Sequence, residues 1–200
     1  ETVREMMKTV GLDPNMINRY PHELSGGQNQ RVGIARAMIT RPKLIVCDEA
    51  VSALDVSIQA QIVKLLKDLQ DEFGMSMLFI SHDLSVVRAI SNRIMVLYLG
   101  RVVETAPADE LYAKPLHPYT EALFASVPTL GTGRANFHPI KGEIPSPINP
   151  PKGCAFHPRC PLAGPRCKTE VPRLVNPKDN RSVACHLHDG GTGAETGAAA

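Results

Sequence analysis

The stretch Leu24-Ser25-Gly26-Gly27-Gln28 decides how the rest of the chain is interpreted. Ser25 stands where a helix N-cap is expected and Gln28 follows three residues later, which is the pattern of a capping box. Gly26 and Gly27 have no side chains, so a phosphate can approach the backbone N–H groups at the positive end of the helix. An ordinary capped helix with two permissive glycines has the same pattern, so the neighbouring residues must decide between the two interpretations.

A short apolar run with two acids at its end follows. Residues Leu44 to Cys47 predict a buried parallel strand, which places Asp48 and Glu49 at its carboxyl end. Open α/β sheets bind ligands at that edge. One carboxylate can bind Mg²⁺ there while the other orients or deprotonates a water. A helix N-cap is the alternative interpretation of such a pair.

Helices and strands are predicted around this strand. A helix is expected from Gly26 to about Thr40, an amphipathic helix from about Ser57 to Phe73, and a strand from Met75 to Ile80. His82 follows this second strand and therefore lies on the same sheet edge as Glu49. Residues 93–99 and 101–105 predict a hairpin around Gly100. The side chains expected to face the core are Val32, Ala35, Met38 and Ile39 on the first helix, and Ile58, Ile62, Leu65, Leu66, Leu69 and Phe73 on the second.

The composition changes along the chain. The net charge of +2 argues neither for nor against nucleic acid, and no run of about 18 apolar residues predicts a membrane span. Thirteen of the 17 prolines and four of the five cysteines follow Lys114. We therefore expect a boundary near residues 114–118 between a regular α/β body and an irregular extension. The Gly/Ala-rich end, residues 188–200, is expected to be disordered.

The motifs, in this order and at this spacing, resemble those of the ATPase subunits of ABC transporters. Residues Leu24 to Gln28 match the signature motif of that family, Leu44 to Asp48 match its Walker B strand, and Glu49 stands at the place of the catalytic glutamate. Ser52-Ala53-Leu54-Asp55 matches the D-loop, and His82 matches the switch histidine. The resemblance covers about residues 1–113.

The resemblance implies an α/β fold of the P-loop NTPase (ABC ATPase) class, represented by its C-terminal part with a remnant of the helical subdomain. A Pro/Cys-rich irregular extension would follow it. The expected divisions are a helical subdomain with the signature motif (1–40), the C-terminal half of the RecA-like ATPase core (41–113), the extension (114–187) and the disordered tail (188–200).

The phosphate-binding loop is not found in these residues. No G-x-x-x-x-G-K-[ST] motif and no Gly-Lys dipeptide occur in the 200 residues. The resemblance places this loop upstream of Glu1, and the charged helical start also suggests that the sequence begins inside a longer chain. We therefore expect the complete protein to hydrolyse ATP and this chain alone to be inactive.

The family mechanism assigns roles to the matched residues. Two ATPase subunits would sandwich ATP, with Ser25, Gly26, Gly27 and Gln28 reaching the γ-phosphate bound by the other subunit. Asp48 would hold Mg²⁺, Glu49 would activate water, His82 would sense the γ-phosphate and Asp55 would cross the dimer interface. The implied partners are a second ATPase subunit, two transmembrane permease subunits and, indirectly, an extracytoplasmic substrate-binding protein. The implied location is peripheral, at the cytoplasmic face of the inner membrane.

Sequence around the D-loop and in the extension indicates one subgroup within this family. Residues 49–57, His117-Pro118-Tyr119-Thr120 and the stretch from Gly142 to Cys167 resemble the oligopeptide/dipeptide importers. Glutathione and nickel importers carry similar sequences, so the cargo stays open. A soluble ABC ATPase acting on nucleic acid or the ribosome is an alternative, but its tandem cassettes or coiled-coil insertion are not found here, and we expect no nucleic-acid partner. A metal-binding regulatory module is a third reading.

Four cysteines mark the extension. Cys154, Cys160, Cys167 and Cys185 are separated by 5, 6 and 17 residues, which is not the C-x2-C pairing usual for zinc. Free thiols and a four-thiolate site compete as interpretations, and a disulfide is disfavoured for a cytosolic subunit. Some peptide-importer relatives carry a [4Fe–4S] cluster at matching cysteines, so a cluster is preferred over Zn²⁺. His157 and His186 are possible substitute ligands, whereas Cys47 is expected to be a buried small hydrophobe.

Overall fold

The computed structural model describes residues 1–126, 140, 142–178 and 180–189. Contacts divide the chain into two compact units, Glu1–Ile90 and Ser91–Ala200. The domain boundaries predicted after residues 40, 113 and 187 were placed by sequence motifs, whereas the two units are defined by contacts. These domain boundaries therefore stay predictions. Most of the tail that was expected to be disordered lies outside the described residues. No helix among the described residues is long and apolar enough to span a membrane.

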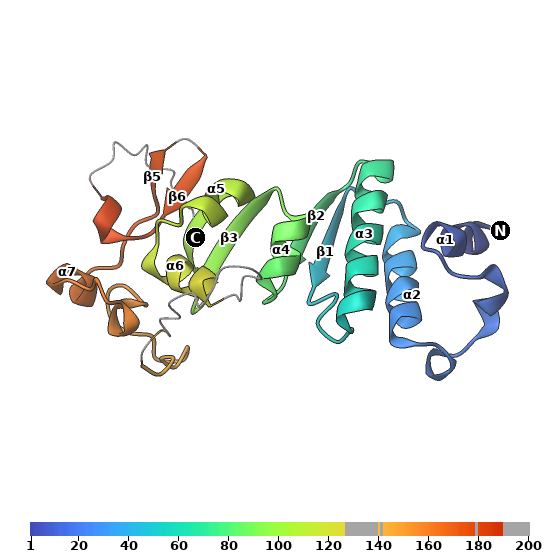
Figure 1. The fold of residues 1–200 in the computed structure, drawn as a ribbon, viewed down its shortest axis with the longest axis horizontal. Coiled ribbons are helices and arrows are strands. Elements are labelled where there is room, and N and C mark those ends of the chain that lie inside the picture. The colour runs from blue at the N-terminus through green and yellow to red at the C-terminus, as the bar shows by residue number, and fades with distance from the viewer. Residues whose placement is uncertain (127–139, 141, 179, 190–200) are drawn as a thin grey trace, which may run out of the picture. The chain divides into compact units, whose positions relative to one another are not determined.

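The first unit packs helices on a pair of parallel strands. Strands β1 and β2 pair in register from Leu44↔Ser76 to Asp48↔Ile80. Figure 1 shows α3 lying along this pair, with α2 beside α3. The elements are α1 (Thr2–Thr9), η1 (Pro14–Asn18), η2 (Pro21–Glu23), α2 (Gly26–Met38), β1 (Leu44–Asp48), α3 (Val56–Phe73), β2 (Ser76–Ile80) and α4 (Leu84–Ile90).

The buried stripe of α3 is confirmed, whereas that of α2 is partly wrong. Of the six predicted α3 side chains, Ile62, Leu66 and Leu69 are buried in the core, and Ile58, Leu65 and Phe73 are partly buried and pack against it. Gly74 ends the helix in the left-handed conformation with φ +61°. On α2, Met38 is fully buried and Ala35 packs against the core as predicted, whereas Val32 and Ile39 are exposed and Ile34, which was not predicted, is buried. Ile34 and Met38 lie one turn apart on the same helix face, and Val32 and Ile39 lie on the other side of the helix.

Only one face of the β1–β2 pair is buried. Cys47 is 8% exposed, as predicted for a small hydrophobe, and burial raises the pKa of its thiol. On the opposite face Val46 and Leu78 keep 56% and 53% of their surface exposed. Parallel strands are normally covered on both faces. The prediction of a fully buried strand is therefore wrong. The described residues cover one face of the β1–β2 pair and leave the other face exposed.

The second unit is built on a four-stranded antiparallel sheet in the order β3-β4-β6-β5. Leu99 and Gly100 join the predicted hairpin with φ values of +47° and +74°, as a tight two-residue turn requires. The elements are β3 (Arg93–Tyr98), β4 (Arg101–Pro107), α5 (Ala108–Ala113), α6 (Pro118–Ala125), η3 (His157–Arg159), α7 (Pro165–Thr169), β5 (Val175–Lys178), β6 (Arg181–Val183) and η4 (His186–His188).

The extension is less irregular than its composition predicts. Strand β6 pairs with β4, and the N–H of Ala184 donates to the carbonyl of Val103 at 2.9 Å. Phe156 is 1% exposed and packs against Tyr98, Tyr119 and His117 at ring-centroid distances of 5.3, 5.4 and 5.9 Å. The extension therefore supplies part of the core of the second unit.

A buried ion pair joins β6 to β4. Arg181 Nη2 lies 2.9 Å from Glu104 Oε1, and Glu104 is fully buried. The two carboxylate oxygens of Glu104 also accept the N–H groups of Leu116 and His117, each at 2.9 Å. His117 in turn caps α6, since its Nδ1 accepts the N–H of Tyr119 at 3.0 Å, and burial lowers the pKa of its imidazole to about 4. Glu104 thus anchors both β6 and the start of α6.

Candidate functional site

The helix start at Ser25 has the capping box that its sequence predicts. The N–H of Gln28 donates to Ser25 Oγ at 3.3 Å, and the N–H of Ser25 donates to Gln28 Oε1 at 2.9 Å. Because α2 begins at Gly26, this reciprocal pair uses only some of the free N–H groups of its first turn. The remaining N–H groups of the first turn suit an anion.

Gly27 has a second role, which the sequence did not suggest. A Cβ atom at Gly27 would lie 2.8 Å from Ile58 Cγ2, and one at Gly26 would lie 3.6 Å from Leu54 Cδ2. The start of α2 therefore packs closely against the D-loop and the first turn of α3. Asp55 caps that turn by accepting the N–H of Ile58 at 2.9 Å. The structure thus brings the signature motif and the D-loop together.

Glu49 and His82 meet at the carboxyl ends of β1 and β2. Glu49 Oε1 lies 3.0 Å from His82 Nδ1, and both side chains are substantially exposed, at 45% and 76%. Their hydrogen bond and opposite charges lower the pKa of Glu49 and raise the pKa of His82. Asp48, the last residue of β1, pairs in register with Ile80, two residues before His82. The sheet edge predicted for these three residues is therefore the one on which they lie.

The backbone of Glu49 is strained. Its φ is +50°, in the left-handed region that non-glycine residues rarely adopt. Hydrogen bonds on both sides hold it there: its N–H donates to the carbonyl of Ile80 at 3.0 Å, and its own carbonyl accepts from Ser52 Oγ at 3.0 Å. Such strain gathers at functional sites, where surrounding contacts impose a conformation that the residue would otherwise avoid. Nothing in the sequence predicts this feature.

Two of the four cysteines of the extension lie close together, because the N–H of Cys154 donates to the carbonyl of Cys167 at 2.9 Å. Cys185 is influenced by the charges of Cys154, Cys160 and Cys167, and burial, as the largest cause, raises its pKa to about 11. Burial also raises the pKa of Cys154 and Cys160. The backbone N–H groups of Phe156, Leu162 and Leu187 partly offset this rise in the pKa of Cys154, Cys160 and Cys185.

These thiols do not form a ready metal site. Within the described part of the chain, no group of three or more His, Cys, Asp or Glu side chains is arranged to hold a metal ion. His186 is also occupied as a substitute ligand, because both ring nitrogens have partners: Asp189 Oδ2 at 2.9 Å and the carbonyl oxygen of Glu170 at 3.0 Å. His157 Nδ1 lies 2.9 Å from the carbonyl oxygen of Cys154. The predicted iron–sulfur or zinc site is therefore without support from the geometry.

Two protein-family models match the chain. Residues 1–52 match the model described as ABC transporter, and residues 103–167 match the model described as oligopeptide/dipeptide transporter, C-terminal region. The first match contains the signature motif together with Asp48 and Glu49, and the second contains three of the four cysteines.

Full-length relatives extend the likeness over most of the chain. The oligopeptide transport ATP-binding protein OppF of Escherichia coli is 57% identical over 188 residues, which are 92% of this chain and 56% of OppF. The oligopeptide transport ATP-binding protein AppF of Bacillus subtilis is 55% identical over 94% of this chain and 58% of its own length. The di/tripeptide transport ATP-binding protein DppF of Pseudomonas aeruginosa is 52% identical over 93% and 58%. The chain thus spans about half the length of the curated relatives it matches.

Solved structures agree on the fold. The ADP conformation of an ATP-binding cassette of an ABC transporter superposes with a TM-score of 0.54 at 23% identity, over 63% of this chain and 49% of that one. An inward-facing ABC transporter of the metal-chelate type gives a TM-score of 0.55 at 28% identity, over 64% and 48%.

Proposed function

Because the chain belongs to the family of ABC transporter ATP-binding proteins, with a C-terminal region of the oligopeptide/dipeptide type, we propose that it contributes to the ATP hydrolysis that powers peptide import across the cytoplasmic membrane. The observation that carries this proposal is the contact between Glu49 and His82 at the carboxyl edge of β1 and β2. The names of the relatives support oligopeptides or di- and tripeptides as the cargo.

The acids at this edge suit Mg²⁺. Mg²⁺ in nucleotide sites takes one or two protein carboxylates, with substrate phosphates and waters completing its octahedron. Asp48 and Glu49 offer such carboxylates, so a set of three protein ligands is not needed. When bound, Mg²⁺ neutralises charge on the phosphates. Asp48 would hold the metal ion, which leaves the carboxylate of Glu49 for the attacking water.

Glu49 and His82 have the two remaining roles, which are contact with the attacking water and contact with the γ-phosphate. The pKa of Glu49 is lowered by His82, so its carboxylate is ionised and able to accept a hydrogen bond from water. The exposed His82 ring holds that carboxylate in place, and its other nitrogen is directed elsewhere, which suits contact with a γ-phosphate. Loss of that phosphate would then directly change the contact between His82 and Glu49, as in other switches that respond to a phosphate.

The signature motif would act on a neighbouring subunit. Its free N–H groups lie at a helix start without a lysine, which suits capping a phosphate that another chain already holds. Ser25 and the two glycines would thus contact ATP in trans, and Asp55 would lie at the same interface. We propose a second ATPase subunit, two permease subunits and an extracytoplasmic binding protein as partners, with the protein peripheral on the cytoplasmic face of the inner membrane.

The function is tested by peptide uptake. In cells that lack their own oligopeptide ATP-binding subunit, the full-length protein should restore uptake of a radiolabelled tripeptide, whereas Ser25→Arg should abolish it. Arginine removes the cap of α2 and fills the space that a phosphate would take. Lys64→Gln, an exposed change on α3, is the control and should restore uptake. Equal uptake by Ser25→Arg, at equal protein level, would contradict the proposed role.

A four-thiolate site in the extension is the second proposal. Its support is the close approach of two of the four cysteines, because the N–H of Cys154 donates to the carbonyl of Cys167 at 2.9 Å. All-thiolate ligation suits either a [4Fe–4S] cluster or Zn²⁺. Iron, sulfide and zinc should be measured in protein purified without air. About one cluster or one Zn²⁺ per chain is expected, and a metal-free protein would overturn this proposal.

A further inference from the structure

The start of α2 rests on the D-loop and on the first turn of α3. The nearest atom that a Cβ atom at Gly27 would meet is the Cγ2 methyl of Ile58, at 2.8 Å. The Cδ1 and Cβ atoms of the same side chain follow at 3.8 and 4.0 Å. At Gly26, by contrast, a Cβ atom would lie 3.6 Å from Leu54 Cδ2, an ordinary van der Waals distance. The tight contact is therefore the one between Gly27 and Ile58.

Ile58 cannot easily move aside for a larger residue at position 27. Its Cγ2 methyl branches directly from Cβ, and a β-branched side chain in a helix is largely held to one χ1 rotamer. The side chain is partly buried and packs against the core of the first unit. Its backbone N–H donates to Asp55 Oδ1 at 2.9 Å, which fixes the turn that carries it. An added methyl at Gly27 would therefore displace the start of α2 rather than Ile58.

The segment between β1 and α3, on which Leu54 lies, is also held by local hydrogen bonds. The carbonyl of Glu49 accepts from the N–H and the Oγ of Ser52, at 3.2 and 3.0 Å. The N–H of Leu54 donates to the carbonyl of Val51 at 3.2 Å, and Val51 is only 2% exposed. The start of α2 therefore packs against a segment with little freedom to move.

This packing gives the second glycine of the signature motif a purpose within its own chain. Because all three of the nearest atoms belong to Ile58, a Cβ atom at Gly27 would enter the contact with α3. The free N–H groups of the first turn point along the helix axis instead, toward the place of a bound anion. The absence of a side chain at Gly27 thus serves the position of the helix start, and through it the position of these donors.

We propose that Ile58 is a positioning residue: through Gly27 it sets where the start of α2 lies, and so where the signature motif meets the phosphate. The proposal rests on the function proposed above, in which Ser25 and the two glycines contact ATP in trans. The steric contact itself needs no nucleotide. Ile58 lies outside the four residues that match the D-loop, and it contacts α2 rather than the phosphate.

The proposal is tested by making room at Ile58 for alanine at Gly27. In the full-length protein, Gly27→Ala should lower kcat for ATP hydrolysis about 10- to 100-fold, the effect of a misplacement of about 1 Å. The KM for ATP should change less than about threefold, because the missing interaction acts on phosphate that another chain already holds. Adding Ile58→Leu should restore most of the lost kcat, since leucine has no second branch at Cβ. Adding Ile58→Val should restore none, since valine keeps both branches.

Two single variants are the controls. Gly33→Ala is the same change on the same helix, at a position where a Cβ atom would meet nothing within 4 Å, and it should hydrolyse ATP like the unchanged protein. Ile58→Leu alone should lower kcat less than Gly27→Ala does, because apolar exchanges that conserve volume are well tolerated.

Hydrogen exchange without nucleotide separates this proposal from the proposed function. The N–H of Gln28, which donates to Ser25 Oγ at 3.3 Å, should exchange faster in Gly27→Ala and in the double variant with valine. It should exchange at the original rate in the double variant with leucine. If these rates are found but the unchanged protein hydrolyses no ATP, the proposed function fails and the positioning by Ile58 stands.

Three results would overturn the proposal. One is an unchanged kcat in Gly27→Ala, and another is a recovery with leucine no greater than that with valine. The third is a loss of protection in Gly27→Ala that includes the amides of β1, which pairs with β2 from Leu44↔Ser76 to Asp48↔Ile80. The contact would then be needed for folding of the first unit rather than for the position of the helix start.

Discussion

Glu49→Gln is expected to lower ATP hydrolysis by the full-length protein at least about a hundredfold, the range typical of a lost general base. Glutamine has the same shape and can still contact His82, but it cannot accept a proton from water. ATP binding should persist, so that ATP-bound dimers accumulate and can be measured by size-exclusion chromatography. Unchanged turnover would contradict the role proposed for Glu49. Glu72→Gln, the same change at an exposed position on α3, is the matched control and should hydrolyse ATP normally.

The same substitution has a second readout that needs no nucleotide. The Glu49 carboxylate raises the pKa of His82 by its hydrogen bond and its charge. In Glu49→Gln the charge is gone, so the imidazole of His82 should titrate at a lower pH, which NMR of the 200-residue chain can follow. An unshifted His82 titration would mean that the 3.0 Å contact does not form in solution.

Glu104→Gln is expected to destabilise the second unit by about 3–5 kcal/mol, the usual effect of breaking a buried ion pair from one side. The carboxylate is fully buried and satisfies Arg181 and the N–H groups of Leu116 and His117. Glutamine leaves the guanidinium without a counter-charge and turns one acceptor into a donor that faces N–H groups. Urea unfolding of the reduced chain, followed by hydrogen exchange at Ala184, measures the loss.

Two further variants serve as controls for the stability loss expected of Glu104→Gln. Glu110→Gln changes an exposed carboxylate on α5 and should alter stability by no more than about 0.5 kcal/mol. The double variant Glu104→Gln/Arg181→Met removes the stranded charge and should recover part of the lost stability. If Glu104→Gln unfolds at the same urea concentration as the unchanged chain, the buried network does not hold the extension.

Local sequence patterns predicted most of the first unit. The stripe of α3, the cap at Ser25 and the order strand–helix–strand all follow from residues near one another in sequence. The meeting of Glu49 with His82 was also predictable, because parallel neighbouring strands bring their carboxyl ends to one edge. The stripe of α2 was predicted only in part. Met38 and Ala35 face the core, but Val32 and Ile34 are both apolar, and the helices packed against α2 decide which of the two is buried.

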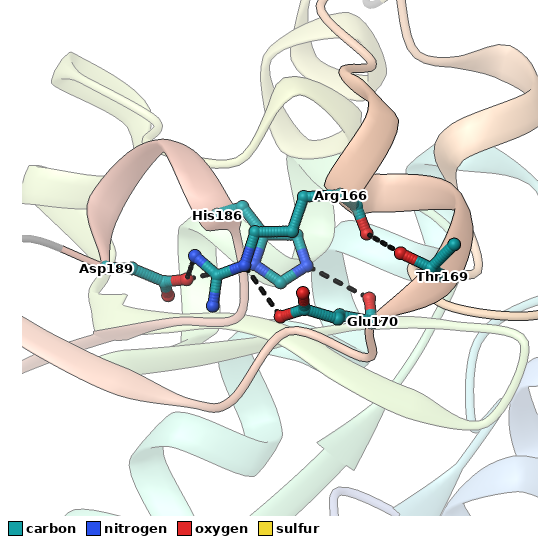
Figure 2. A network of polar contacts seen from close by, with 5 residues as sticks. All are labelled: Arg166, Thr169, Glu170, His186 and Asp189. Atoms are coloured by element: carbon teal, nitrogen blue, oxygen red, sulfur yellow. Dashed lines mark hydrogen bonds and ion pairs between the residues drawn. The ribbon is translucent and has the colours of Figure 1, made fainter.

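The second unit shows what local patterns cannot reveal. The pairing of β6 with β4 joins Arg181 to Glu104, which are 77 residues apart in the sequence. The residues next to each of them in the sequence do not indicate a buried partner. Proline-rich composition predicted irregularity, but it does not exclude short strands that an existing hairpin can recruit. The contacts of His186 with Glu170 and Asp189 (Figure 2) were equally hidden, because its sequence position suggested a substitute metal ligand instead.

The left-handed backbone of Glu49 bears on how such sequences evolve. A residue with a Cβ at φ +50° costs about 1 kcal/mol or more relative to glycine, and asparagine also tolerates the position better than glutamate. Selection for stability alone would therefore favour glycine or asparagine at position 49, and only the need for a carboxylate there opposes it. In a lineage that no longer needs hydrolysis, replacement of Glu49 by glycine or asparagine should therefore be tolerated and should relax the backbone.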